Sequence, residues 1–304
     1  MMSCCIRILA RVVQLGGLSC LGCGLIAGVE DGTLAPPDGG APTSSASGTG
    51  AGTSTSTSTG TGAGGGTGGG CGCDYAAVVL EDQPVAYWRL GEGMVAATAE
   101  DEVGRHPGTY NAGTSPGKAG AFPCDTAVEF HQPGSVSVAD SPELEFLYDG
   151  MDGSDSFALE AWIKTTEGGS VCGKTTYEVP DGGDTAQYAG YLLVARTGPF
   201  RVAFVRGNGM EGGVATLNAD APADEWIHVV AQYNGSQKFL YVNATTTPAT
   251  QNDTHHDQPD LAVDFMIGDA PWGNFEGLID EVAVYDHTLE PDRIAAHHAA
   301  CPRR

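Results

Sequence analysis

The sequence predicts an all-β fold, a two-sheet antiparallel sandwich that follows a long segment without regular structure. Two observations carry this prediction. After residue 73, short segments of alternating apolar and polar residues recur between turn residues, and alternation with a period of two is typical of strands. By contrast, residues 32–70 are almost all Gly, Ser, Thr, Ala and Pro and cannot bury a core. We therefore expect one folded domain over residues 73–304.

Residues 1–28 have the pattern of a secretory signal. Arg7 and Arg11 precede an apolar stretch over residues 12–29, after which acidic and small residues take over. A membrane-spanning helix is the alternative, but the stretch holds five glycines in 18 residues and lies near the lower limit of length for a span. The sequence therefore favours an exported protein.

Two cysteines inside this stretch indicate how the signal is processed. Cys20 and Cys23 each follow a small residue, which resembles a bacterial lipoprotein processing box whose cysteine is lipidated. Ordinary cleavage near Ala27 or Gly28 is the alternative. In either case we expect residues 29–72 to form a disordered linker that holds the folded domain away from a surface.

Five cysteines remain for the exported chain. Cys71 and Cys73 open the domain and Cys301 closes it, so a disulfide between the ends, Cys73–Cys301, would clamp the two termini together. Cys124–Cys172 is the natural second pair. Because five is odd, either Cys71 or Cys73 is left over or the pairing differs. A zinc site is disfavoured, since Cys-Gly-Cys has no second ligand cluster at suitable spacing.

The expected elements follow in chain order. A brief helical pattern begins at Tyr75, and a second helix is expected over Pro291–Ala299, with proline at its first position. Asn234-Gly235 predicts a type I′ hairpin turn, which needs positive φ at both central positions. The expected strands share alternation or apolar character: 85–90, 127–130, 136–138, 157–164, 191–194, 200–205, 226–233, 238–242, 265–268 and 278–285.

The charge of the chain limits the classes of partner. The 304 residues include 38 acidic and 14 basic side chains, a formal net charge of -24. Such a surface repels phosphate backbones and anionic lipid headgroups. We expect no nucleic-acid binding, and contact with a membrane only through the N-terminal lipid.

Several of these segments together resemble the laminin-G-like, concanavalin A-like jelly-roll family. The segments that carry the resemblance occur in the family's order: 85–92, 108–110, 127–130, 157–164, 226–235 and 275–285. The resemblance covers residues 74–300. It implies a jelly roll with one concave face, binding of glycans or extracellular proteins, and often a structural calcium ion.

The spacing of the acidic residues does not match that of a glycoside hydrolase of this architecture. Glycoside hydrolases of this architecture carry Glu-x-Asp-x-Glu on one strand, because alternate residues share a face. The sequence holds no such triplet. Consecutive acids at 100–102 and 280–281 are expected to point to opposite faces. We therefore predict a non-catalytic binding module; a glycoside hydrolase is the weaker alternative.

Asp280 is the candidate metal ligand. It lies in phase with Val282 and Val284, so it is expected to point inward, where a charge needs a partner. Calcium, shared with Asp101 and carbonyl oxygens of the 101–108 loop, is the partner that the resemblance implies. Pairing with Arg89, Arg293 or backbone amides is the alternative. The family's Asp-x-Ser-Gly-Asn-Gly pattern is absent from this loop, which weakens the calcium interpretation.

A ligand site is predicted near the end of the domain. Trp272 could stack on a sugar ring while Asp269 and Asn274 bond its hydroxyl groups, with Tyr191 and Arg201 contributing from neighbouring strands. Alternatively, Trp272 fills the rim of the sandwich. A carbohydrate or cell-surface glycan is the leading partner, and adhesion through protein contacts is the second hypothesis.

Three histidines are predicted to have structural rather than catalytic roles. His228 shares a face with Trp226 and is expected to be packed and hydrogen-bonded. His297 and His298 end the last predicted helix, where they would interact favourably with its dipole.

Overall fold

The computed structural model describes residues 73–146, 156–178, 187–210, 213–254, 260–270 and 273–302. The predicted signal over 1–28, its cysteines Cys20 and Cys23, and the linker over 29–72 lie outside this part of the chain. The described residues form 15 strands and three short helices, so the all-β prediction is confirmed.

The elements have the following bounds: α1 Tyr75–Glu81, β1 Ala86–Trp88, β2 Thr98–Ala99, β3 Gly108–Tyr110, β4 Thr114–Ala119, β5 Thr126–Phe130, β6 Val136–Val138, the 3-10 helix η1 Pro142–Leu144, β7 Phe157–Glu178, β8 Gln187–Arg196, β9 Arg201–Asn208, β10 Val214–Asp220, β11 Ile227–Tyr233, β12 Gln237–Val242, β13 Ala249–Asn252, β14 Phe265–Ile267, β15 Glu276–Tyr285 and α2 Pro291–Ala299. The predicted final helix has these same bounds. Strands β2, β4, β10 and β13 were not predicted. The sequences of β4 and β13 are largely polar, whereas β10 has Ala215, Leu217 and Ala219 at alternate positions.

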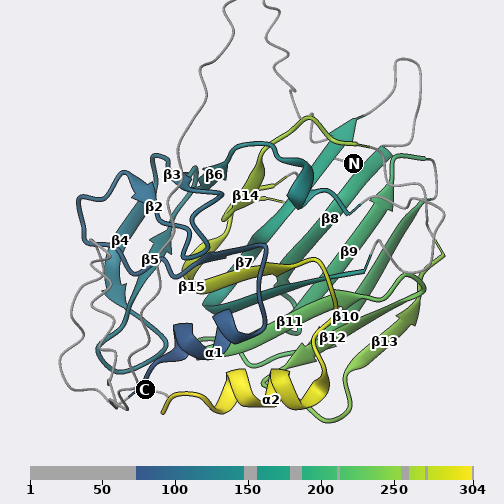
Figure 1. Cartoon of the computed structure of the whole chain (residues 1–304). Coiled ribbons are helices and arrows are strands. Elements are labelled where there is room, and N and C mark those ends of the chain that lie inside the picture. The colour runs from purple at the N-terminus through teal and green to yellow at the C-terminus, as the bar shows by residue number, and fades with distance from the viewer. Residues whose placement is uncertain are drawn as a thin grey trace, which may run out of the picture. The chain divides into compact units, whose positions relative to one another are not determined.

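The strands form two antiparallel sheets that share β7 (Figure 1). Sheet 1 has the order β13-β12-β11-β7-β15-β5-β4, and β1 pairs with the second half of β15. Sheet 2 has the order β10-β9-β8-β7-β14-β6-β3-β2. Alternate side chains of both sheets meet in one large apolar core, which includes Trp88, Ile163, Phe204 and Phe265. This is the predicted jelly-roll sandwich.

Strand β7 passes from one sheet to the other at two glycines. Its residues up to Gly168 pair within sheet 1, and those from Gly169 onward pair with β8 in sheet 2. Gly168 and Gly169 have φ of 81° and 115°, values that other residues rarely adopt. A Cβ on Gly169 would lie 2.1 Å from the backbone oxygen of Asn274. Glycine is therefore required where the strand bends.

The outer face of sheet 1 is covered by α1 and α2, which lie near each other (Figure 1). Tyr75 and Val79 of α1 and Ile294 of α2 pack there against Trp162 and Tyr285. Within the described residues, no helix has the length and apolar character needed to cross a bilayer.

A disulfide joins the two ends of the described domain. Cys73 and Cys301 are bonded across 228 residues of sequence, as predicted. The predicted pair Cys124–Cys172 is wrong: Cys172 is a buried free thiol, whereas Cys124 is disulfide-bonded. Cys172 lies in the core between the sheets, whereas Cys124 lies exposed in the loop before β5. The two cysteines therefore lie in different parts of the domain.

The β11–β12 hairpin forms where Asn234-Gly235 predicts it, but its turn is of another type. Only Gly235 has positive φ, at 89°, and the closing hydrogen bond runs from the amide of Asn234 to the oxygen of Gln237. Gly235 and Ser236 are thus the central residues. The Asn234 side chain stabilises the turn by accepting from the amides of Ser236 and Gln237.

Candidate functional site

Three carboxylates gather on the outer face of sheet 1. The ligand atoms of Asp125, Asp280 and Glu281 all lie within 4.8 Å of one another. Asp280 and Glu281 are consecutive, and a regular strand would send them to opposite faces. A bulge in β15 between Asp280 and Ala283 changes this, with Glu281 at φ 52°. We call these three residues the acidic triad.

The same bulge overturns the predicted direction of Asp280. Asp280 pairs with Trp162, which packs on the outer face of sheet 1, whereas Val282 and Val284 point into the core between the sheets. The inserted residue shifts the phase of the strand by one position. Asp280 is nevertheless fully buried.

Among the described residues, one cation, Arg89, pairs with the triad. Arg89 donates to Glu281 Oε1 at 3.3 Å and to Asp125 Oδ1 at 3.4 Å, and Tyr87 donates its hydroxyl to Glu281. Asp280 Oδ2 accepts from the amide of Ala121 at 2.9 Å. Asp280 Oδ1 is buried and has no hydrogen-bond partner among the described residues.

The pKa values of Asp280 and Glu281 are raised because both carboxylates are buried beside another acid. Burial raises the pKa of Glu281 to about 8, and Asp125 adds to the rise while Arg89 opposes it. Burial and the charges of Asp125 and Glu281 hold the pKa of Asp280 well above its ordinary value. The site therefore resists ionisation unless a further cation is present.

Asp101, the predicted partner of Asp280, has another role. Its carboxylate accepts four hydrogen bonds from backbone amides, those of Tyr87, Val103, Arg105 and His106, at 2.8 to 3.1 Å. It thereby organises the loop after β2. The acid that lies beside Asp280 is Asp125.

An open pocket of about 480 Å³ lies between the edge strands of the two sheets. One wall consists of Asn218 and Asp220 on β10, and the opposite wall includes Leu240 on β12. Thr245 and Thr247, between β12 and β13, complete the polar lining. Amide, carboxylate and hydroxyl groups can donate to and accept from sugar hydroxyls.

The structure separates the residues of the predicted ligand site. Tyr191 is wrong as a surface residue: its ring lies in the core, and its hydroxyl donates to the Leu144 oxygen at 2.7 Å. Arg201 is half-buried on β9, two residues before Ala203, which packs on the outer face of sheet 2. Adjacent strands thus carry Tyr191 and Arg201 to opposite faces.

The other three predicted ligand residues come from the loop before β15. Asp269 and Asn274 are half-buried, and Trp272 lies outside the described residues. Burial raises the pKa of Asp269.

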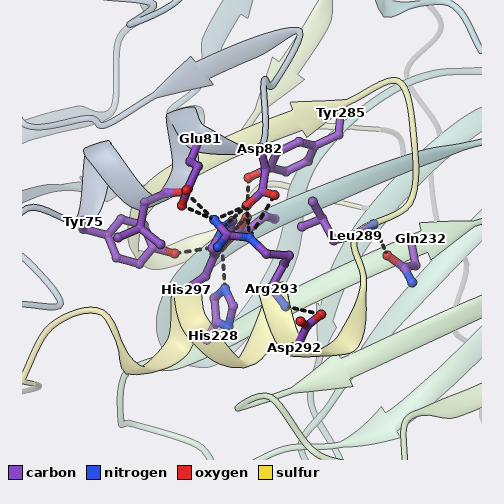
Figure 2. A network of polar contacts seen from close by, with 12 residues as sticks. Tyr75, Glu81, Asp82, His228, Gln232, Tyr285, Leu289, Asp292, Arg293 and His297 are labelled. Carbon is purple, nitrogen blue, oxygen red and sulfur yellow. Dashed lines mark hydrogen bonds and ion pairs between the residues drawn. The ribbon is translucent and has the colours of Figure 1, made fainter.

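A buried polar network holds the terminal helices on sheet 1 (Figure 2). Its centre is Glu160 on β7, which accepts from Tyr75 at 2.8 Å and Tyr285 at 2.6 Å. His228 Nε2 lies 2.7 Å from Glu160 Oε1, so the expected packed, hydrogen-bonded histidine is confirmed. His297 lies 3.0 Å from both carboxylate oxygens. The network joins α1, α2 and three strands.

His297 does more than interact with a helix dipole. Its Nε2 lies 2.6 Å from Asp82 Oδ2, so both ring nitrogens face carboxylates. Both nitrogens donate only in the imidazolium form. Burial lowers the pKa of His297, but the charges of Glu160 and Asp82 outweigh it and the pKa is raised.

Residues 135–295 match the family described as the concanavalin A-like lectin/glucanases superfamily. The match spans just over half of the chain. The chain belongs to this superfamily. The superfamily resemblance expected from the sequence is thereby confirmed, and the concanavalin A-like fold agrees with the two sheets described above. No curated protein matches the chain in sequence.

Solved structures share the concanavalin A-like fold at low sequence identity. The binding domain of Paraclostridial Mosquitocidal Protein 1 is 11% identical, with a TM-score of 0.52 over 72% of this chain and 52% of that one. The receptor binding domain of botulinum neurotoxin D is 13% identical, with a TM-score of 0.52 over 72% and 53%. This chain therefore spans about half the length of each.

A domain of an enzyme also resembles the chain. Domain 4 of AbnA, a GH43 extracellular arabinanase from Geobacillus stearothermophilus solved with arabinotriose, is 15% identical. The alignment covers 71% of this chain and 98% of that one, with a TM-score of 0.45. The description of the matched superfamily names both lectins and glucanases.

Sequence reasoning missed Glu160, Asp125 and Glu281, although two of them leave a trace. Glu160 is a lone acid within an apolar strand, and Asp280-Glu281 places adjacent acids in another. Such acids need partners when buried. Asp125 lies in a loop and gives no comparable signal.

Proposed function

We propose that this chain is an exported, non-catalytic module that binds carbohydrate or cell-surface glycan. The pocket between β10 and β12–β13 carries the proposal, because its polar groups suit hydroxyl-rich ligands and its lining includes no cation. Membership of a lectin-like superfamily supports it. So does the shared fold of two domains that are named as binding domains. The predicted loop with Asp269, Trp272 and Asn274 is the second candidate position.

The burial of the acids supports a non-catalytic role. A glycosidase needs two carboxylates that reach opposite sides of a sugar bond. In the acidic triad, Asp280 and Glu281 are fully buried, so neither can contact a polysaccharide. The Cys73–Cys301 disulfide fits an oxidising compartment outside the cytoplasm. Lipidation at Cys20 or Cys23 stays a prediction, which the intact mass of the mature protein would test.

A glycan array with the exported chain tests the proposal. We expect binding of a neutral glycan that is lost in Asn218→Ala/Asp220→Ala and kept in Asp286→Ala, a matched exposed control. Loss only in Trp272→Ala would move the site to the predicted loop. Binding to protein partners without glycans would favour the adhesive role, and release of reducing sugar would show a hydrolase.

We also propose that the acidic triad holds a structural calcium ion. The residues fit the ion: three carboxylates face one arginine, and the buried Asp280 Oδ1 accepts no hydrogen bond from any described residue. Calcium takes six to eight oxygen ligands and would neutralise the remaining negative charge. Its role would be to stabilise the bulged end of β15.

Calcium binding should increase the free energy of unfolding. At a calcium concentration one hundred times the dissociation constant, the free energy of unfolding should rise by about 2.7 kcal/mol. Asp280→Asn should abolish this increase. Asp101→Asn should be less stable than the wild type without calcium, but calcium should raise its unfolding free energy by the same amount. Equal melting temperatures with calcium and with a chelator would contradict the proposal.

A further inference from the structure

Two basic side chains from different sheets meet inside one end of the sandwich. Arg206 on β9 and Lys238 on β12 are both buried, with side-chain exposures of 1% and 0%. Arg206 pairs across the strands with Tyr191, and Lys238 with Tyr233, both of which belong to the core. We call these two side chains the buried basic pair.

Among the described residues, Arg206 and Lys238 form ion pairs with the same carboxylate, that of Asp253. Oδ2 of Asp253 lies 2.9 Å from Nη1 of Arg206 and 3.7 Å from Nζ of Lys238. Asp253 is itself fully buried. Among the described residues, two buried positive charges thus face one buried negative charge. An uncompensated buried charge is strongly unfavourable.

Two donor atoms of the buried basic pair also lack a partner among the described residues. Neither Nη2 of Arg206 nor Nζ of Lys238 forms a hydrogen bond with any of them. The other neighbours are aromatic: the guanidinium carbon of Arg206 lies 3.5 Å from the Tyr233 ring centroid, and Nζ of Lys238 lies 5.8 Å from that of Phe204. Ring faces attract cations but accept no strong hydrogen bond.

We propose that the buried basic pair binds a small monovalent anion of the halide class, with chloride as the ion to test. One negative charge balances the excess, and a spherical ion can accept from Nη2 and Nζ together. A larger organic anion does not suit side chains that expose 1% or less of their surface. This site is independent of the proposed glycan and calcium sites.

The protonation of Lys238 sets the pH range of the site. Burial lowers the pKa of Lys238 to about 8, the charge of Asp253 opposes the shift and that of Arg206 adds to it. The rings of Tyr233 from β11 and Phe204 from β9 also face the pair. Chloride should therefore bind below pH 8 and weaken above it as the ammonium loses its proton.

Thermal unfolding of the full chain in sodium chloride and in sodium gluconate at equal ionic strength tests the site. Above the dissociation constant, each tenfold rise in chloride should add about 1.4 kcal/mol of stability relative to gluconate. Lys238→Met should remove the chloride dependence even if its own stability is unchanged or higher. Lys118→Met, at an exposed lysine, should keep it.

Bromide supplies a direct readout. In bromide-soaked crystals we expect an anomalous scattering peak within hydrogen-bond distance of Arg206 Nη2 and Lys238 Nζ. Equal stability in chloride and gluconate, a chloride effect that persists in Lys238→Met, or an ordered water in place of bromide would overturn the proposal.

Discussion

The imidazole of His297 lies 3.0 Å from the carboxylate of Glu160, and both side chains are fully buried. This pair connects the last helix to the central strand that both sheets share. The pKa of Glu160 is well below its ordinary value: burial raises it, but the charge of His297 and the hydrogen bonds from both histidines outweigh burial. Both groups are therefore ionised, because the charge of each one stabilises the charge of the other.

Glu160→Gln should destabilise the domain strongly. The change leaves the His297 imidazolium buried beside a neutral amide, and breaking a buried ion pair costs about 3 to 5 kcal/mol. Chemical denaturation measures the loss. As a control, Glu143→Gln replaces a half-exposed carboxylate that pairs with His106 and the exposed Arg105, and it should reduce the unfolding free energy far less. A similar small effect for both variants would show that Glu160 is not a structural centre.

The stability of this network should pass through a maximum with pH. The raised pKa of His297 gives stability that is fully present below its ordinary pKa of 6.5 and is lost as pH rises through the folded value. The lowered pKa of Glu160 gives stability that is present above its ordinary pKa of 4.5 and is lost as pH falls through the folded value.

His297→Gln isolates this contribution. Glu281, whose pKa is raised to about 8, also reduces stability as pH rises, so wild type and variant must be compared at each pH. We expect the difference in unfolding free energy between them to shrink from pH 6.5 upward. A difference that stays constant across this range would mean that His297 is neutral in the folded protein.

Removing the terminal disulfide should lower stability without changing the fold. For a loop of 228 residues, the chain-entropy model gives roughly 5 kcal/mol. Cys73→Ala/Cys301→Ala should therefore melt at a clearly lower temperature while its circular dichroism spectrum stays that of a β protein. An unchanged melting temperature would show that the Cys73–Cys301 disulfide is not needed to stabilise the domain.

Cys172 should resist alkylation in the native protein. Burial raises the pKa of its thiol to about 12, so neither thiolate nor access is available. Peptide mapping after iodoacetamide treatment should find Cys172 unmodified in buffer and modified in denaturant without reductant. Modification in buffer would indicate local opening of the core, and no modification in denaturant would indicate a disulfide.

How far the sequence predicts the site depends on the regularity of each strand. Strand β15 was recognised from its apolar residues, but the direction of Asp280 was wrong because a bulge inserts Glu281 with positive φ. Alternation predicts faces only where the strand has no inserted residue. Likewise, β13 was missed because its polar sequence lacks the apolar signal. β10 was missed although Ala215, Leu217 and Ala219 alternate with polar residues, and both strands line the pocket.

The sequence by itself determined the all-β class, the superfamily and the final helix, and it predicted a disulfide between the chain ends, because these follow from local periodicity, ordered motifs and chain ends. The structure decided that Cys73 rather than Cys71 pairs with Cys301. Only the tertiary structure decided which charges meet. Glu160 with His297, Asp280 with Asp125, and Arg206 with Lys238 come from segments far apart in the chain. Long-range contacts depend on strand register and on bulges, which local patterns do not specify.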